Sequence, residues 1–274
     1  MAAHALTDTD WLTLFASIGA SVRTVVAPVA GTEAGRAELA TGAGGDRTVE
    51  VDRLAESVAV AALEKVAQAG ARFRLLSEEI GERDFGAESP TILLDPIDGS
   101  LNAKQGLPLY AIMLSLVDEP RVGGVRAGYV MNLATGEAWS AIRGGGAWRA
   151  GQRLDPLPRR PSRRFEVLAL ESSPRSLVKA EALVQRSAKV RILGSMAISI
   201  AQAAAGSFDV FCSPIDARVF DMTASLLVLK ESGGVATDMQ GRSLDQLGVD
   251  LETRSTLLCS ADVHAHEQAL EILR

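Results

Sequence analysis

Two aspartates, Asp95 and Asp98, follow an apolar run and precede Gly99 and Ser100 in the stretch LDPIDGS. Pro96 restricts the backbone between them, so both carboxylates can face one point beyond the end of a strand. Close carboxylates repel unless a cation neutralises them, and hard cations such as Mg²⁺ prefer oxygen ligands. The N–H groups that follow Gly99, with the Ser100 hydroxyl, form a candidate cradle for phosphate oxygens. A metal site beside an anion cradle is what phosphoryl transfer requires.

Taken alone, the motif is also compatible with an aspartate-rich turn that caps a helix. Its spacing is not that of an EF-hand loop, nor is it the Asp-x-Asp of enzymes that form an aspartyl phosphate. Two further segments bear on the choice. Glu78 and Glu79 close the preceding apolar run, and Asp221 opens a predicted helix. Each has an ordinary interpretation, because paired glutamates are often surface charge and a helix-start aspartate is often a cap.

Together these segments resemble the inositol monophosphatase family, within the superfamily that includes fructose-1,6-bisphosphatases. The family's marks are a Glu-Glu pair, then Asp-Pro-x-Asp-Gly-Thr/Ser, then a Trp-Asp that opens a helix ending near Glu-x-Gly-Gly. All occur here in order, with Phe220 in place of the tryptophan. The resemblance runs from about Thr48 to the C-terminus. It includes NLATGE at 132–137 and RILGSMA at 191–197.

The resemblance implies a set of metal ligands. Glu78, Asp95 and the main-chain carbonyl of Ile97 would hold one Mg²⁺ ion. Asp95, Asp98 and Asp221 would hold a second, and a third, looser ion would lie near Glu78. The ions would activate the attacking water, hold the phosphate and stabilise the leaving alkoxide without a covalent intermediate.

Catalytic roles follow from the same resemblance. Asp52 would polarise the Ser100 hydroxyl, which would orient the attacking water, and Glu78 counts as catalytic as well as metal-binding. Glu79 would support these groups rather than bind metal. The N–H groups of Gly99 and Ser100 would grip the phosphate.

The substrate pocket is less completely specified. Gly194 and Ser195 are expected to line it. The family's glutamate that reads substrate hydroxyls is not evident in residues 209–221, where Asp216 and Arg218 are the candidates. This segment is closer to the archaeal-type bifunctional inositol monophosphatase/fructose bisphosphatase branch.

The implied reaction is hydrolysis of a small phosphate monoester, with inositol 1-phosphate as the first candidate substrate. Alternatives on the same scaffold are fructose 1,6-bisphosphate, for which Arg191 or Arg218 would read the second phosphate, 3′-phosphoadenosine 5′-phosphate and histidinol phosphate. A different class of function is an inactive protein that binds polyol phosphates. Retention of all four metal carboxylates argues against that class.

Several elements must position these residues. Hydrophobic periodicity and turn residues predict helices at 8–29, 52–69, 174–187, 196–205, 221–232 and after Asp262, and strands at 73–76, 91–94, 110–117, 125–131, 137–142, 147–149, 167–170, 190–193, 209–212, 235–237 and 256–260. Residues 31–47 are expected to form a mobile loop, and 155–164, rich in Pro and Arg, a linker. We therefore expect an α/β fold with two halves, 1–155 and 156–274, arranged as a layered α/β/α/β/α sandwich with the metal ligands between them.

Composition and net charge further restrict what kind of protein this is. With 274 residues, 47% of them hydrophobic, and a net charge of −6, the chain is typical of a globular protein and lacks the basic face of a nucleic-acid binder. The basic residues at 159–164 are expected to be a solvated linker. The absence of a signal peptide, of an apolar run of spanning length, and of a CxxC pair predicts a cytoplasmic protein with Cys212 and Cys259 packed as small apolar residues. We expect His264 and His266 on the surface. A homodimer is expected by resemblance alone.

Overall fold

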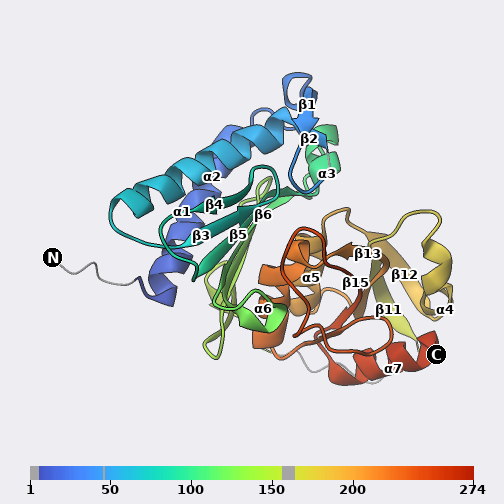
Figure 1. The fold of residues 1–274 in the computed structure, drawn as a ribbon. Helices are drawn as coiled ribbons and strands as arrows, with labels where there is room; N and C mark the ends of the chain where they lie inside the picture. The colour runs from blue at the N-terminus through green and yellow to red at the C-terminus, as the bar shows by residue number, and fades with distance from the viewer. Residues whose placement is uncertain (1–5, 46, 156–163) are drawn as a thin grey trace.

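The computed structural model describes residues 6–45, 47–155 and 164–274 of the chain. Two sheets alternate with three layers of helices (Figure 1). The predicted α/β/α/β/α sandwich is therefore confirmed. From the N-terminal side the helical layers are α1 (Asp8–Val26) with α2 (Glu50–Gln68), then α5 (Met196–Ala204) with α6 (Thr223–Glu231), then α4 (Glu181–Gln185) with α7 (Val263–Leu273).

Helix α1 shows why the N-terminal layer forms. Its apolar residues recur every three or four positions, so one face is buried against α2 and the larger sheet. Thr7 and Asp10 form the predicted capping box, in which Asp10 N donates to Thr7 Oγ1 at 3.2 Å and Thr7 N donates to Asp10 Oδ2 at 2.9 Å. The helix ends at Val26, three residues before the predicted end.

The larger sheet has eight strands in the order β10-β9-β8-β7-β6-β5-β3-β4. All neighbours are antiparallel except β3 and β5, which are parallel. Its strands are β3 (Arg74–Ser77), β4 (Gly81–Asp84), β5 (Thr91–Asp98), β6 (Ala111–Val117), β7 (Val125–Asn132), β8 (Ala138–Ile142), β9 (Gly146–Arg149) and β10 (Gln152–Arg153). Strands β6 and β7 are buried almost throughout, which fits their place inside the sheet.

Strand β5 differs from the prediction in a way that matters for the site. It does not stop at Leu94 but continues through Asp98, with one extra residue between Asp95 and Asp98 relative to β6. Asp95 lies opposite Met113 and Asp98 opposite Ala111. In a regular strand residues three apart face opposite sides, so the bulge is what brings both aspartates to the same face.

The smaller sheet has five strands in the order β12-β11-β13-β15-β14. Strands β11, β12 and β13 run parallel, so their carboxyl ends lie at one edge of the sheet. The bounds are β11 (Phe165–Leu170), β12 (Ser187–Ile192), β13 (Val210–Arg218), β14 (Val235–Thr237) and β15 (Arg254–Ser260).

Two segments differ from the prediction. Residues 31–47 hold the short helix η1 (Ala34–Arg36) and, with β2 (Arg47–Val49), the strand β1 (Glu38–Thr41), rather than only a loop. The helix predicted at 174–187 is reduced to η3 (Leu177–Ala180) and α4. Leu177 and Val178 remain exposed, so no continuous apolar face is available there, and Ser187 pairs with Phe165 instead.

The sequence analysis also did not predict the strands β4 and β10 or the short helices α3 (Ser100–Gln105), η2 (Val122–Gly124) and η4 (Phe220–Met222). Most of the predicted linker, 156–163, lies outside the described residues, as do Arg159, Arg160 and Arg163 of the basic run.

The largest core lies between the two sheets and contains α5 and α6. The eight-stranded sheet comes entirely from residues before 155 and the five-stranded sheet from residues after 164, and this core contains residues of both sheets. Cys212 and Cys259 are buried free thiols, as expected. His264 is exposed, but the surface expectation for His266 was wrong: it is buried, and its Nε2 lies 3.0 Å from Thr237 Oγ1.

In the ranges that the model describes, no helix combines the length and apolar character needed to cross a lipid bilayer.

Candidate active site

Three carboxylates from distant parts of the sequence lie close together in the structure. One oxygen from each of Glu78, Asp95 and Asp221 lies within 4.8 Å of the others. Glu78 follows β3 directly, and because Ser77 pairs with Leu94 on the parallel neighbour β5, Glu78 comes out beside Asp95. Asp221 reaches the same point from η4, which leads into α6.

Glu56 holds the end of β3 in place. It lies on α2, is 6% exposed, and accepts hydrogen bonds from the Ser77 hydroxyl at 2.5 Å and from Ile80 N at 3.1 Å. Burial raises its pKa, and these hydrogen bonds oppose the rise. The turn that carries Glu78 is therefore fixed from the helical layer behind the sheet.

The cluster carries more negative charge than its surroundings balance. Asp95 is 1% exposed, and burial followed by the charges of Glu78, Asp221 and Asp98 raises its pKa well above the ordinary value. Burial raises the pKa of Asp221 to about 7, although the nearby Arg218 opposes the rise. Asp221 Oδ1 is buried with no hydrogen-bond partner among the described residues. All-oxygen donors, excess charge and an unpaired oxygen fit a hard divalent cation.

Arg218 lies inside this cluster rather than at its edge. Its Nη2 donates to Glu78, its Nε donates to Asp221 Oδ2 at 3.0 Å, and its Nη1 donates to Gly44 O at 3.3 Å. Burial alone would lower its pKa, but the charges of Asp221 and Glu78 raise it above the ordinary value. The residue that the sequence suggested as a substrate reader thus contacts two predicted metal ligands.

Asp98 faces the same side of the sheet as Asp95 but contacts the start of α5. Its Oδ1 accepts from Met196 N at 3.1 Å, and its Oδ2 accepts from Ala197 N at 2.9 Å and from the Ser195 hydroxyl. A negative charge is stabilised at a helix N-terminus. Burial raises the pKa of Asp98 to about 6, while these hydrogen bonds oppose the rise. Asp98 is not one of the three carboxylates within 4.8 Å of one another.

Asp52 and Ser100 are neighbours, as expected. Asp52, in the first turn of α2, is 2% exposed, and its Oδ2 accepts from Val49 N at 2.9 Å while Oδ1 has no partner in the described structure. Burial raises its pKa to about 7, and the nearby Ser100 hydroxyl opposes the rise. That hydroxyl donates to Ile97 O at 2.9 Å. Since a hydroxyl can rotate, Ser100 can turn between these two acceptors.

The backbone after Asp98 requires glycine. Gly99 has φ +88°, and a Cβ there would lie 3.0 Å from both Gly194 O and Leu109 O. Asn102, which the sequence did not single out, donates from Nδ2 to Leu109 O and to Leu193 O, each at 2.7 Å. The predicted phosphate cradle is thereby tied to the turn that carries Gly194.

The site residues that the sequence predicted gather around one cleft of about 590 Å³. Every residue predicted for the site lies on its wall except Ser195, which is buried beneath it. Asp216, an exposed residue, and Arg254 also line a neighbouring polar cleft of about 720 Å³.

The sequence did not identify Glu171, which also lines the active-site cleft. It directly follows the apolar strand β11, and its Oε2 accepts from Gly194 N at 3.1 Å. Burial and then the charge of Asp98 raise its pKa to about 7. An acidic residue at the end of an apolar strand run, the pattern that marked Asp95, was the available signal.

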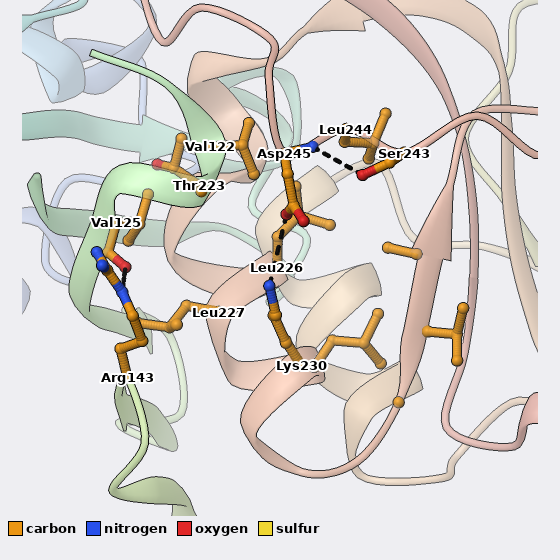
Figure 2. Close-up of a pocket in the computed structure, with 15 residues that line it drawn as sticks. Val122, Val125, Arg143, Thr223, Leu226, Leu227, Lys230, Ser243, Leu244 and Asp245 are labelled. Carbon is orange, nitrogen blue, oxygen red and sulfur yellow. Dashed lines mark hydrogen bonds and ion pairs between the residues drawn. The ribbon is translucent and has the colours of Figure 1, made fainter. Parts of the chain in front are cut away.

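A separate cavity of about 230 Å³ lies against α6, away from these groups (Figure 2). Its wall includes Leu226, Leu227 and Lys230, and Lys230 Nζ lies 3.5 Å from Asp245 Oδ1. It contains none of the predicted site residues, so its shape does not bear on the chemistry of the cleft.

Comparison with known proteins agrees with the family resemblance that the sequence motifs indicated. The model of the inositol monophosphatase family matches residues 12–274, beginning well before the point where the resemblance by motif starts. A fructose-1,6-bisphosphatase/inositol-1-monophosphatase from Methanothermobacter thermautotrophicus is 30% identical, over 96% of each chain.

Two further matches are a longer bifunctional relative and a solved structure. A bifunctional NADP phosphatase/NAD kinase from Methanococcus maripaludis is 27% identical over 93% of this chain, which spans only 48% of that protein. The solved extragenic suppressor protein suhB from Bartonella henselae has a TM-score of 0.80 at 23% identity, covering 96% of this chain and 98% of that one. The last likeness concerns the fold.

Proposed function

Because this chain belongs to the inositol monophosphatase family of metal-dependent phosphatases, we propose that it hydrolyses a small polyol or sugar phosphate, with inositol 1-phosphate as the first substrate. The observation that carries the proposal is the meeting of Glu78, Asp95 and Asp221 in a cleft that also contains Gly99 and Ser100. Carboxylates that gather a cation beside backbone donors for an anion are suited to phosphoryl transfer.

We propose that Glu78, Asp95, the Ile97 carbonyl, Asp98 and Asp221 hold two or three Mg²⁺ ions. Such ions, when bound, supply a Lewis acid and an activated water. The buried, repelling carboxylates and the unpaired Asp221 Oδ1 support this assignment. The third-ion assignment rests on resemblance alone.

The chain's own groups take the remaining roles. The N–H groups of Gly99 and Ser100 bind the phosphate, and the Ser100 hydroxyl, held by Asp52, orients the attacking water. Arg218 balances part of the negative charge at Glu78 and Asp221, a role compatible with its two ion pairs. Asp98 keeps α5 and the Gly194 turn in register with the strand that carries the metal ligands.

A second candidate is a larger substrate with another anionic group, such as fructose 1,6-bisphosphate or 3′-phosphoadenosine 5′-phosphate. The specific observation in its favour is the neighbouring cleft, which joins the first at Asp216 and Arg254 and also carries Lys179. Arg191 does not support this candidate, since it is exposed and donates to Val190 O at 2.9 Å. The relatives named for fructose-1,6-bisphosphatase and NADP phosphatase activity motivate the comparison.

The test is phosphate release in Mg²⁺ and in EDTA from inositol 1-phosphate, fructose 1,6-bisphosphate, 3′-phosphoadenosine 5′-phosphate, NADP and histidinol phosphate. We expect metal-dependent release, fastest from inositol 1-phosphate. Fastest release from a bisphosphate would favour the second candidate. No metal-dependent release from any of these compounds would refute the proposal.

We also propose that the protein is a cytoplasmic homodimer. The two free buried thiols are compatible with a reducing compartment, and the dimer is expected from the resemblance. Light scattering in solution should give about twice the chain mass of 28.9 kDa.

A further inference from the structure

Glu171 lies at the edge of the smaller sheet where a ligand is expected. It follows β11, which runs parallel between β12 and β13; β11 and β12 end side by side at Leu170 and Ile192, whereas β13 continues to Arg218. Ligands of open α/β sheets bind beyond such ends. Its backbone N donates to Cys212 O at 3.1 Å, and its Oε2 accepts from Gly194 N at 3.1 Å. Glu171 is therefore fixed in the cleft wall, its backbone by β13 and its carboxylate by the turn that follows β12.

The other acidic residues on the described cleft wall differ from Glu171 in position or in what they contact. Three of them form the acidic cluster, Asp98 accepts three hydrogen bonds at the start of α5, and Asp52 lies beside Ser100. Glu79, on the same wall, lies near Asp52, and its charge raises the pKa of Asp52. Asp216 is exposed at the junction of the two clefts. A carboxylate has about four lone-pair positions, so Glu171 keeps acceptor capacity beyond its bond from Gly194 N.

In its ionised form, the Glu171 carboxylate restricts the kind of ligand group that it can bind. An ionised carboxylate repels phosphate and attracts neutral hydrogen-bond donors, of which hydroxyl groups are the commonest on a polyol. Gly194, whose N–H donates to Glu171, lies close to Gly99. A Cβ added to Gly99 would lie 3.0 Å from Gly194 O. Hydroxyls beside the phosphate ester would therefore come within reach of Glu171 when the phosphate lies on the Gly99 cradle.

We propose that Glu171 is a specificity-determining residue that accepts hydrogen bonds from the hydroxyl groups adjoining the phosphate ester of the substrate. This rests on the proposed function and deepens it. Glu171, which directly follows β11, supplies a carboxylate for the substrate hydroxyls. No glutamate for this role was evident in residues 209–221, which include the neighbouring strand β13. Arg218 is not needed to contact the alcohol part of the substrate, since its guanidinium already donates to Glu78, Asp221 and Gly44.

The test compares Glu171→Gln with the wild-type chain on two substrates in Mg²⁺. One is inositol 1-phosphate, or whichever polyol or sugar phosphate the wild-type chain hydrolyses fastest. The other is 4-nitrophenyl phosphate, which has no hydroxyl group. We expect kcat/KM to fall at least ten-fold more for the polyol phosphate, mainly through KM, because only that substrate loses a charge-assisted hydrogen bond.

Glu166→Gln is the matched control, since Glu166 is exposed on the same strand. It should leave both rates and their ratio as in the wild type. Thermal unfolding of each variant checks that it is folded, and inhibition by inorganic phosphate should change by less than two-fold in Glu171→Gln.

An equal loss on both substrates, or no loss on either, in an active protein would overturn the role of Glu171 alone. A folded wild-type chain with no Mg²⁺-dependent activity on any substrate would overturn the proposed function, and this inference with it.

Discussion

The substitution Asp95→Asn tests two effects of the acidic cluster: its proposed role in metal binding and activity, and the loss of stability that its charge repulsion causes in the metal-free protein. The asparagine keeps Oδ1, which accepts from Ile97 N at 3.0 Å, so the local turn is preserved. It removes a negative charge from a group whose oxygens lie within 4.8 Å of one another. The variant should therefore lose metal binding and activity while the metal-free protein becomes more stable.

The expected gain follows from the geometry. Two unit charges no more than 4.8 Å apart repel by about 3 kcal/mol or more at an effective dielectric constant of about 20. The metal-free wild-type chain carries this repulsion at a pH above the raised pKa of Asp95, where that carboxylate is ionised. Arg218 offsets part of this repulsion through its contacts with Glu78 and Asp221. We expect a net gain of about 1–3 kcal/mol in EDTA, which for a chain of this size raises Tm by roughly 2–4 °C per kcal/mol.

The assay is thermal unfolding in EDTA and in excess Mg²⁺, together with phosphate release. Wild-type Tm should rise on adding Mg²⁺ and that of Asp95→Asn should rise much less, with activity at least about a thousand-fold lower because a ligand of the catalytic ion is lost. Asp155→Asn, at a residue whose side chain is 81% exposed, is the matched control and should change neither quantity. Near wild-type activity in Asp95→Asn would refute the metal assignment, and a lower Tm in EDTA would refute the repulsion argument.

Three further predictions concern the same site. Arg218→Met should lower Tm in EDTA by an amount equivalent to about 3–5 kcal/mol, because Glu78 and Asp221 lose a buried partner; titration with Mg²⁺ should restore more stability than in the wild type, and an unchanged Tm in EDTA would contradict this. Gly99→Ala should cut activity at least ten-fold and lower Tm, because the new Cβ would lie 3.0 Å from Gly194 O at φ +88°; kinetics and thermal unfolding check it, and normal values for both would show that the cradle tolerates a side chain. The metal-free protein should become less stable as pH rises from about 4 to 7. Burial raises the pKa of Asp52 to about 7 and that of Asp98 to about 6, so the stability that these groups contribute is full below their unfolded value of 3.8 and is lost as pH rises through the folded values. Thermal scans in EDTA across this range measure the effect, and a Tm that rises with pH would contradict the sign.

Much of the architecture was accessible from local patterns. Helix α1 followed from apolar residues at helical spacing and from the Thr7–Asp10 capping box, and both sheets were indicated by short apolar runs between turn residues. The helix predicted at 174–187 is shorter, η3 followed by α4, and its last predicted residue, Ser187, pairs with Phe165 in the sheet instead. Pairing between distant segments outweighed a local preference there, since sequence spacing does not report strand partners.

The sequence by itself determined which chemical groups are present and that several follow apolar runs: Glu78, Asp95 and, unnoticed, Glu171. Tertiary structure decided which of them meet. The parallel pairing of β3 with β5 brings Glu78 beside Asp95, and the bulge in β5 brings Asp98 to the same face. Only the fold places Arg218 among the carboxylates, because proximity between residues far apart in sequence depends on sheet order and register, which local spacing does not encode.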